Sequence, residues 1–379
     1  MPSNIEWTEE TWNPVVGCSI VSPGCTNCYA MKMAARLEAM RTAPHYAATT
    51  QKTKAGPVWT GKVAMAPDSV LYAPLKRRKP TLYFVNSMGD LFHVDVTDAM
   101  IDQVFAVMAL TPHHTYQILT KRAARMRHYM AGRSAKLARY MTVQFIAEAP
   151  DEASGGRARL THWPVVNDAS ADLFNATERL VMAQWPLPNV WLGVSAEDQA
   201  RWDERVPELL WTPAAKHFVS VEPMVGPIDP TKIDVLGGDA ELYPLEWTTD
   251  VTDGSDEELP DIPPLDWIIV GGESGKAARP MHPDWAREIR DACAEAGVAF
   301  FFKQWGEWAP GANNAGGISR RTERVAEWWN DQWDYHRVTP KESEDMHVDD
   351  EPTVWRLGKR QTGRHLDGVI HDSMPEVSR

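Results

Sequence analysis

The sequence predicts an α/β protein built on a parallel β-sheet covered by helices, and three observations support this fold class. Short, continuously apolar runs recur along the chain, as expected for strands buried on both faces. Segments with helical periodicity alternate with these runs. Polar or charged residues follow the apolar runs, as they do at the functional edge of parallel sheets.

The apolar runs define six expected strands, at residues 82–86, 115–120, 189–194, 218–222, 267–271 and 298–303. Helical patterns cover residues 99–110, 123–130, about 199–210 and 284–296. Thr97 and Asp98 are suited to cap the first helix, and Gly297 to close the last. The periodicity leaves open whether the sheet is an open doubly wound sheet or a complete or partial barrel.

Two segments interrupt the alternation. Residues from about 142 to 188 have mixed composition, and residues from about 237 to 264 are acidic and Pro-rich, which predicts a solvent loop. The alternation stops beyond Pro310. We therefore expect a barrel-like unit at residues 1–309 with these two insertions, followed by a C-terminal extension at residues 310–379.

Composition and charge narrow the function classes. The 379 residues are 43% hydrophobic, which suffices for a sizeable core, and no apolar run is long enough to span a membrane. The N-terminus lacks the pattern of a secretory signal, so a cytoplasmic protein is expected. The net charge of −13 argues against coating nucleic acid by bulk electrostatics. Basic residues at 121–128 and 356–365 are either solvated surface or an anion site.

The strongest local signal is a cluster of three cysteines, Cys18, Cys25 and Cys28. Two cysteines separated by two residues can bind one metal centre, and a third thiolate can reach it across the Pro23-Gly24 turn. The remaining cysteine, Cys293, lies in a predicted helix where it serves packing. Three thiolates without a fourth favour an iron–sulfur cluster with one open iron. Structural zinc with a histidine as fourth ligand, for example His45 or His93, is the alternative.

Polar or glycine residues follow each expected strand. In chain order they are Ser87, Gly89 and Asp90, then Lys121, then Ser195 and Glu197, then Glu222, then Gly271, Gly272 and Glu273, and last Lys303. Because the carboxyl ends of parallel strands meet at one edge, they predict a polar mouth above an apolar barrel. The Gly271-Gly272 pair would let the backbone approach a ligand closely.

Several motifs extend this pattern along nearly the whole chain. They include Thr-Trp-Asn-Pro (11–14), Pro-Gly-Cys-x-x-Cys-Tyr-Ala (23–30), Phe-Val-Asn-Ser-Met-Gly-Asp (84–90), Leu-Thr-Lys-Arg (119–122), Val-Gly-Gly-Glu-Ser-Gly (270–275), Phe-Phe-Phe-Lys-Gln-Trp-Gly (300–306) and Gly-Arg-His-Leu-Asp-Gly (363–368). In these motifs the sequence resembles the phage-type three-cysteine-motif family of radical-S-adenosylmethionine-like proteins, long described only as a phage protein of unknown function.

The resemblance implies a partial (β/α) TIM-like barrel of the radical S-adenosylmethionine type, with a [4Fe–4S] cluster on Cys18, Cys25 and Cys28. It implies S-adenosyl-L-methionine as the second cofactor, bound by residues that follow the cysteines and the strands: Tyr29, Ser87, Gly89, Asp90, Lys121, Ser195, Glu197, Gly271 and Gly272. Strand order favours Asp90 for the cofactor's amino group. Glu222, Glu273 and Lys303 would act on the substrate. The usual motif spaces its first two cysteines by three residues, whereas this chain spaces them by six.

The expected function is hydrogen abstraction by a 5′-deoxyadenosyl radical, with an external electron donor of the flavodoxin or ferredoxin type. The two basic segments and the phage-type resemblance favour a nucleobase or nucleic acid as substrate, and a peptide or small metabolite stays open. The alternatives are a non-enzymatic, zinc-binding protein associated with nucleic acid, and a cluster-bearing nuclease or repair protein that uses no S-adenosylmethionine.

Overall fold

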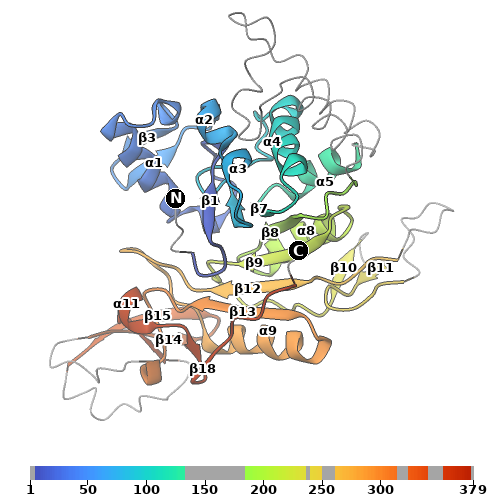
Figure 1. Cartoon of the computed structure of the whole chain (residues 1–379). Helices are drawn as coiled ribbons and strands as arrows, with labels where there is room; N and C mark the ends of the chain where they lie inside the picture. Colours follow the sequence, from blue (N-terminus) through green and yellow to red (C-terminus); the bar gives the residue numbers. More distant parts are fainter. Residues whose placement is uncertain are drawn as a thin grey trace, which may run out of the picture.

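Seven parallel strands form the central sheet, in the same spatial order as they follow along the chain. They are β1 (Glu10–Trp12), β6 (Leu82–Val85), β7 (Thr115–Thr120), β8 (Val190–Ser195), β9 (Lys216–Val221), β12 (Trp267–Gly271) and β13 (Ala299–Gln304). Every neighbouring pair is parallel. A doubly wound sheet reverses its strand order at a switch point, and this sheet does not. The sheet is therefore a curled half-barrel (Figure 1).

This computed structural model describes residues 5–132, 184–235, 240–249, 261–313, 323–339 and 353–376. All six expected strands are confirmed, and β1 is an additional strand at the edge of the sheet. Most of the expected insertion at 142–188 lies outside the described residues. The expected solvent loop at 237–264 is wrong for part of its length, because it includes β11 and the buried Leu242 and Leu245.

Four long helices cover the outer face of the sheet (Figure 1). They are α4 (Asp98–Leu110), α5 (Ala123–Ala131), α8 (Gln199–Leu210) and α9 (Pro283–Ala296), which confirms the four expected helices to within a residue. The Thr97 hydroxyl caps α4 by accepting from the Met100 amide at 3.3 Å, and Gly297 ends α9 with a φ of 71°. None of the described helices is long and apolar enough to cross a membrane.

Smaller elements connect and extend this half-barrel. The N-terminal third adds β2 (Val15–Val16), α1 (Tyr29–Met40), β3 (Thr50–Thr53), β4 (Gly56–Trp59), β5 (Ala64–Met65), α2 (Asp68–Leu71), α3 (Ala73–Lys76) and short 3-10 turns at Pro23–Cys25 and Pro44–Tyr46. The hairpin of β10 (Ile233–Val235) and β11 (Ala240–Leu242) lies near α8.

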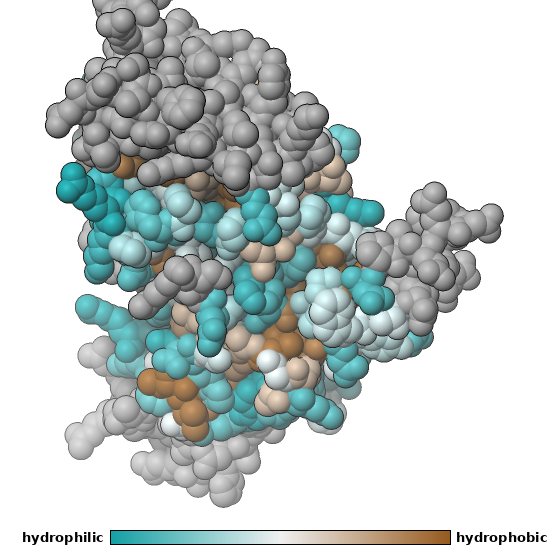
Figure 2. Space-filling model, turned by 45° about the vertical axis from the view of Figure 1, so that its right-hand side comes forward, coloured by the Kyte–Doolittle hydropathy of each residue, from teal (hydrophilic) through white to brown (hydrophobic). Residues whose placement is uncertain are grey.

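The described part of the C-terminal extension contains an antiparallel sheet of β14 (Glu323–Trp329), β15 (Gln332–Val338) and β16 (Thr353–Trp355). It packs on α9, where the rings of Trp285 and Trp328 lie 5.1 Å apart. A 3-10 turn at Gly311–Asn313, α11 (Lys359–Thr362), β17 (His365–Leu366) and β18 (Val369–Ile370) complete the chain. On the face in Figure 2, hydrophilic residues prevail among those described, and hydrophobic ones form smaller separate areas.

The core has two layers because side chains of a strand alternate between its faces. The outer layer joins the sheet to the helices. The inner layer is largely aromatic and contains Trp7, Phe84, Trp191, Phe218, Trp267, Ile269 and Phe301. Gly193 belongs to this inner face as well, because a Cβ there would lie 2.6 Å from the Phe218 ring.

Toward the carboxyl ends of the strands, the residues on the inner face change from aromatic to polar. Each of five residues lies two or four positions after an inner-layer residue of its strand and therefore shares its face: Lys121, Ser195, Glu222, Gly271 and Lys303. These positions follow a floor of aromatic side chains, as in the layered interior of a β/α barrel. The fold therefore places the predicted polar mouth on the concave side of the sheet.

Candidate active site

The three cysteines lie on a segment that we call the cysteine loop, residues 17–28, between β2 and α1. Gly17 allows the loop to turn, with a φ of 90° and the Lys62 carbonyl oxygen 2.1 Å from where a Cβ would stand. Cys25 is buried, Cys18 and Cys28 are half-buried, and all three are free thiols. The loop contacts groups at the carboxyl ends of several strands.

The start of the loop is held by Arg122, which follows β7. Its Nη1 lies 2.7 Å from an Asp90 carboxylate oxygen and 3.6 Å from Cys18 Sγ. Its Nη2 donates to the Ser19 hydroxyl at 2.7 Å, and this hydroxyl lies 3.0 Å from His93 Nε2. Asp90, which the sequence assigned to the cofactor's amino group, therefore binds the guanidinium that contacts Cys18.

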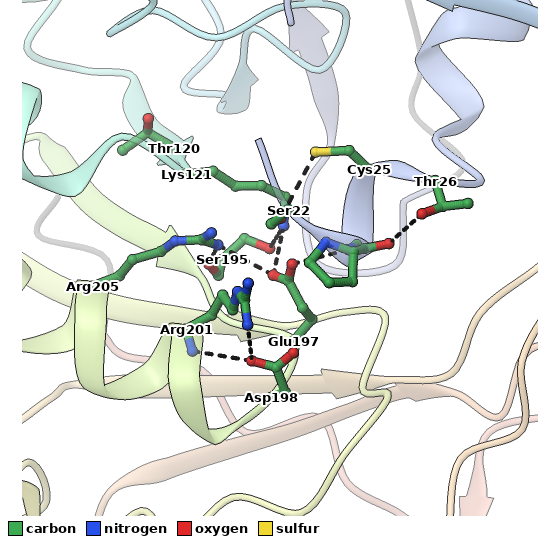
Figure 3. Close-up of polar contacts among 12 residues, drawn as sticks. Ser22, Cys25, Thr26, Thr120, Lys121, Ser195, Glu197, Asp198, Arg201 and Arg205 are labelled. Carbon is green, nitrogen blue, oxygen red and sulfur yellow. Dashed lines mark hydrogen bonds and ion pairs between the residues drawn. The ribbon is translucent and has the colours of Figure 1, made fainter. Parts of the chain in front are cut away.

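The middle of the loop is held by Glu197, and Figure 3 shows this residue among its polar partners. The Glu197 side chain is 0% exposed. It accepts from the Gly24 amide at 2.9 Å, from Lys121 Nζ at 3.1 Å and from Arg205 Nη1 at 3.2 Å. Burial alone would raise the pKa of Glu197. Lys121, hydrogen bonds from Ser22 and Gly24, and Arg205 outweigh this and lower the pKa to about 2.

The local sequence explains why Glu197 occupies this position. Asp198 caps α8 by accepting from the Arg201 amide at 3.0 Å, so Glu197 stands between the end of β8 and the start of the helix. Ser195, two residues earlier on the same face, accepts from Lys121 Nζ at 2.7 Å. Lys121, Ser195 and Glu197 therefore form one cluster, as their positions at neighbouring strand ends predicted.

The segment after β12 contacts the loop in its middle, at Pro23, and near its end, at Asn27. Arg279 makes a two-pronged ion pair with Glu273, with distances of 2.8 and 2.9 Å, and donates to the Pro23 carbonyl at 3.1 Å. The Asn27 side chain donates to the Ala277 carbonyl at 3.1 Å. Glu273, which was predicted to act on the substrate, is thus paired to an arginine that contacts the cysteine loop.

Tyr29 extends from the last cysteine toward the end of β6. Its hydroxyl donates to the Ser87 carbonyl at 2.9 Å. The ring is 55% exposed, yet desolvation by the surrounding protein raises its pKa, with smaller contributions from Cys28 and Glu222. Tyr29 therefore lies near Cys28, the end of β6 and Glu222.

Glu222 and Lys303 form a second polar group, at the carboxyl ends of β9 and β13. Lys303 Nζ lies 2.8 Å from each oxygen of the Glu222 carboxylate. The Gln304 amide donates to Glu222 at 3.3 Å and to the Ser274 hydroxyl at 3.2 Å. None of the described residues donates a hydrogen bond to the buried Gln304 Oε1. We call Glu222 and Lys303 the mouth pair.

The three predicted glycines have different surroundings. A Cβ on Gly272 would lie 1.9 Å from the Trp305 carbonyl oxygen, and one on Gly89 would lie 2.9 Å from the Val15 carbonyl oxygen. At these two positions it is the chain's own backbone that approaches closely. A Cβ on Gly271 would make ordinary contacts of 3.4 to 3.5 Å with the mouth pair. Gly271 therefore leaves a small open space beside Glu222.

The three cysteines are the donor set that a metal centre in this loop would use. Burial, helped by Asp90, raises the pKa of Cys18 to about 12 against the opposing effect of Arg122, and burial also raises the pKa of Cys28. Among the described residues, no three His, Cys, Asp or Glu side chains are placed so that they could hold one metal ion. Three free thiols on one loop are the type of ligand that iron–sulfur clusters take. In the described arrangement these thiols do not converge on one metal position.

The two histidines considered as zinc ligands are placed differently. His93 is fully enclosed and touches Ser19, next to Cys18. His45 lies in a 3-10 turn against the ring of Tyr46, and burial lowers its pKa. Arg205 and Arg279 are important neighbours of the site that sequence reasoning missed. Neither lies at a strand end, so no positional signal distinguishes them from surface arginines.

Comparison with known proteins adds one finding. A family model described as protein of unknown function (DUF5131) matches residues 2–375. No curated protein and no solved structure matches the chain.

Proposed function

The chain belongs to the DUF5131 family, whose function is unknown, and from its site we propose that it is a radical S-adenosylmethionine enzyme. The observation that carries this proposal is a loop with three free cysteines held over the carboxyl edge of a curled parallel sheet. Cys18, Cys25 and Cys28 would hold a [4Fe–4S] cluster, and the open iron would be left to S-adenosylmethionine. Together these groups would supply a 5′-deoxyadenosyl radical for hydrogen abstraction, with electrons from an external flavodoxin- or ferredoxin-type donor.

The contacts of the cysteine loop support this proposal. Arg122 contacts Cys18 and Ser19 at its start, and Glu197 and Arg279 contact Gly24 and Pro23 in its middle. Each of these three residues is itself fixed by an ion pair. Such support places a reactive centre before substrate arrives, which is how a protein lowers the entropic cost of a reaction. In this proposal the carboxylates of Asp90, Glu197 and Glu273 position the loop rather than contact the cofactor.

The surface beside Cys28 is then the place for S-adenosylmethionine. Tyr29, the first residue of α1, and Ser87, which follows β6, are joined there by a hydrogen bond. The tyrosine keeps its proton because its pKa is raised, so it presents a hydroxyl and an aromatic face rather than a charge. An aromatic face is suited to the adenine and the sulfonium of this cofactor.

The mouth pair is the place for the substrate. Lys303 Nζ donates to both oxygens of the Glu222 carboxylate at 2.8 Å, so the pair presents a hydrogen-bond donor and an acceptor side by side to a ligand. Gln304 cannot turn its oxygen toward Glu222 without losing the bond to that carboxylate, so Oε1 stays free to accept from a ligand. A nucleobase edge carries N–H donors that match this acceptor, and we propose a nucleobase-containing substrate.

Anaerobic reconstitution of the full chain with iron, sulfide and a reductant tests the proposal. We expect bound iron and sulfide, the visible absorbance of an iron–sulfur cluster, and release of 5′-deoxyadenosine from S-adenosylmethionine. Cys28→Ala should lose all of these, whereas Cys293→Ala, which changes a buried cysteine in α9, should keep them. Failure of the wild-type chain to bind iron, or a cluster that releases no deoxyadenosine, would refute the proposal.

The same experiment separates the zinc-binding alternative. One observation favours it. His93 Nε2 lies 3.0 Å from the hydroxyl of Ser19, the residue after Cys18, so this histidine is close to the cysteine loop, where a fourth zinc ligand is needed. Anaerobic purification that yields one zinc per chain and no iron, with zinc lost in both Cys28→Ala and His93→Ala, would establish a structural zinc site instead.

A further inference from the structure

Arg364, in the C-terminal extension, has a guanidinium group for which the described residues provide no acidic partner. Its Nε and Nη2 atoms are buried and make no hydrogen bond. The contact that holds the group is the ring of Phe301, with the guanidinium carbon 4.9 Å from the ring centroid. Two N–H groups that are withdrawn from water without an acceptor are unfavourable even on a partly buried arginine, so a role other than packing is indicated.

The other enclosed arginines around the site differ from Arg364. Arg122, Arg205 and Arg279 each pair with a carboxylate, at distances of 2.7, 3.2 and 2.8 Å. The chain has an excess of 13 negative charges, so acidic groups are not scarce. Among the described residues, Arg364 therefore lacks the carboxylate partner that each of these three arginines has.

The location of Arg364 connects it to the mouth. Phe301 belongs to the aromatic inner layer of the sheet, and Lys303 of the mouth pair follows two residues later on the same face of β13. The backbone on both sides of Arg364 is anchored at the end of this strand. The Thr362 hydroxyl donates to the Gly306 carbonyl and the Trp305 indole donates to the His365 carbonyl, both at 2.8 Å. The extension therefore directs this guanidinium to the concave side of the sheet.

We propose that Arg364 binds an oxyanion, a phosphate or a carboxylate, carried by the molecule that occupies the mouth. Its planar guanidinium presents parallel N–H donors that match the two oxygens of such a group, and the anion would supply the missing charge partner. The inference deepens the proposed function, because it assigns an anionic group to a ligand of the same site. It also gives the C-terminal extension a part in that site.

Binding of four probes to the full chain, as purified and without added iron, tests this assignment. The probes are inorganic phosphate, adenosine 5′-monophosphate, succinate and S-adenosylmethionine, each titrated at constant ionic strength. Arg364→Gln should weaken the probe that binds by roughly ten- to a hundredfold, the value of a charge-assisted hydrogen bond. Arg364→Lys keeps the charge but loses the planar guanidinium, so its affinity for the probe should lie between those of wild type and Arg364→Gln. Arg360→Gln, a change of an exposed arginine in α11, is the matched control and should bind like wild type.

The pattern of probes identifies the source of the oxyanion. Loss confined to phosphate and the nucleotide indicates a phosphate-bearing substrate, loss confined to succinate indicates a carboxylate substrate, and loss confined to S-adenosylmethionine indicates the cofactor's carboxylate. If none of the four binds wild type at millimolar concentration, or if Arg364→Gln binds as tightly as wild type, the proposal is wrong. These readouts require no cluster and no turnover, so they stand apart from the test of the proposed function.

A stability measurement distinguishes an anion site from simple packing. Arg364→Met keeps a long apolar side chain over Phe301 and removes the unpaired charge. For an anion site, the ligand-free variant should melt at a higher temperature than wild type, and the rise in melting temperature caused by the binding probe should disappear. A lower melting temperature in the ligand-free variant, with the probe's effect retained, would assign Arg364 to packing alone.

Discussion

The carboxyl edge of the sheet has two regions that use charged side chains differently. We call the first the loop clamp; it consists of Asp90 with Arg122, Lys121 with Glu197, and Glu273 with Arg279. Each of these pairs contacts the cysteine loop through Cys18, Gly24 or Pro23. The second region is the mouth pair, Glu222 and Lys303, whose described hydrogen bonds go to each other and to Gln304.

The carboxylates of the two regions differ in burial. In the loop clamp the side chains of Asp90, Glu197 and Glu273 are 7, 0 and 5% exposed, whereas the Glu222 side chain of the mouth pair is 20% exposed. Breaking a buried pair leaves a charge that water cannot reach, and breaking a partly exposed pair costs much less. Similar residues at neighbouring strand ends thus have different uses: one set fixes the chain itself, and the other is available to a ligand.

The largest expected effect comes from Glu197→Gln. The pKa of Glu197 falls from 4.5 to about 2 in the folded protein, which corresponds to about 3 kcal/mol of stability at neutral pH. The substitution removes this contribution and leaves Lys121 and Arg205 without their shared carboxylate. Urea unfolding at pH 7 should show a loss of this size. A loss below about 1 kcal/mol would show that the loop clamp is no more than a surface ion pair.

The same variant has a defined pH dependence. Because the folded pKa of Glu197 lies below the unfolded value, its contribution is complete above about pH 4.5 and is lost as the pH falls toward 2. The difference in unfolding free energy between wild type and Glu197→Gln should therefore shrink over this range and stay constant from pH 5 to 7. A difference that grows on acidification would contradict the assigned direction.

A glycine in each region gives a matched pair of variants. A Cβ on Gly24 would lie 3.0 Å from the Glu197 carboxylate carbon and 3.2 Å from Lys121 Nζ, so Gly24→Ala should cost about 1 to 2 kcal/mol in unfolding free energy. Gly271→Ala makes only ordinary contacts with Glu222 and Lys303 and should leave stability within about 0.5 kcal/mol of wild type. Equal losses in both would mean that the two regions are packed alike.

Strands were predictable from the sequence where nearly all of their residues are buried. The strand at 267–271 reads Trp-Ile-Ile-Val-Gly and is buried throughout, and the other five expected strands have similar apolar runs. β1 was missed because Glu10–Trp12 has three residues, of which only Trp12 is buried, and it pairs on one side only. Its structure depends on β6 rather than on its own sequence.

The site was predictable as a set of positions and not as a set of partners. Parity along the strands places Lys121, Ser195 and Glu222 on one face, and this follows from alternation alone. That Glu273 would pair with Arg279 rather than face a ligand depends on the path of the loop after β12. Arg364 carries no periodic signal, because its position is set by contacts of the extension with Gly306 and Trp305.

A smaller effect is expected from Arg279→Ala, whose side chain is 31% exposed. Loss of its bonds to Glu273 and the Pro23 carbonyl should lower the local stability of the cysteine loop by about 1 kcal/mol, or roughly fivefold in the population of open loop. The buried Cys25 reports this opening. Alkylation of Cys25, followed by mass spectrometry, should be several-fold faster than in wild type. An unchanged rate would remove Arg279 from the loop clamp.

The smallest effect is expected from Glu222→Gln, and it decides whether the two regions are separate. The partly exposed mouth pair should contribute at most about 1 kcal/mol to stability, and the amide can still accept from Lys303. Because no described hydrogen bond joins Glu222 to the cysteine loop, Cys25 should be alkylated at the wild-type rate. A rate as high as in Arg279→Ala would show that the mouth pair also holds the loop. Substrate binding and loop placement would then be one property of this edge rather than two.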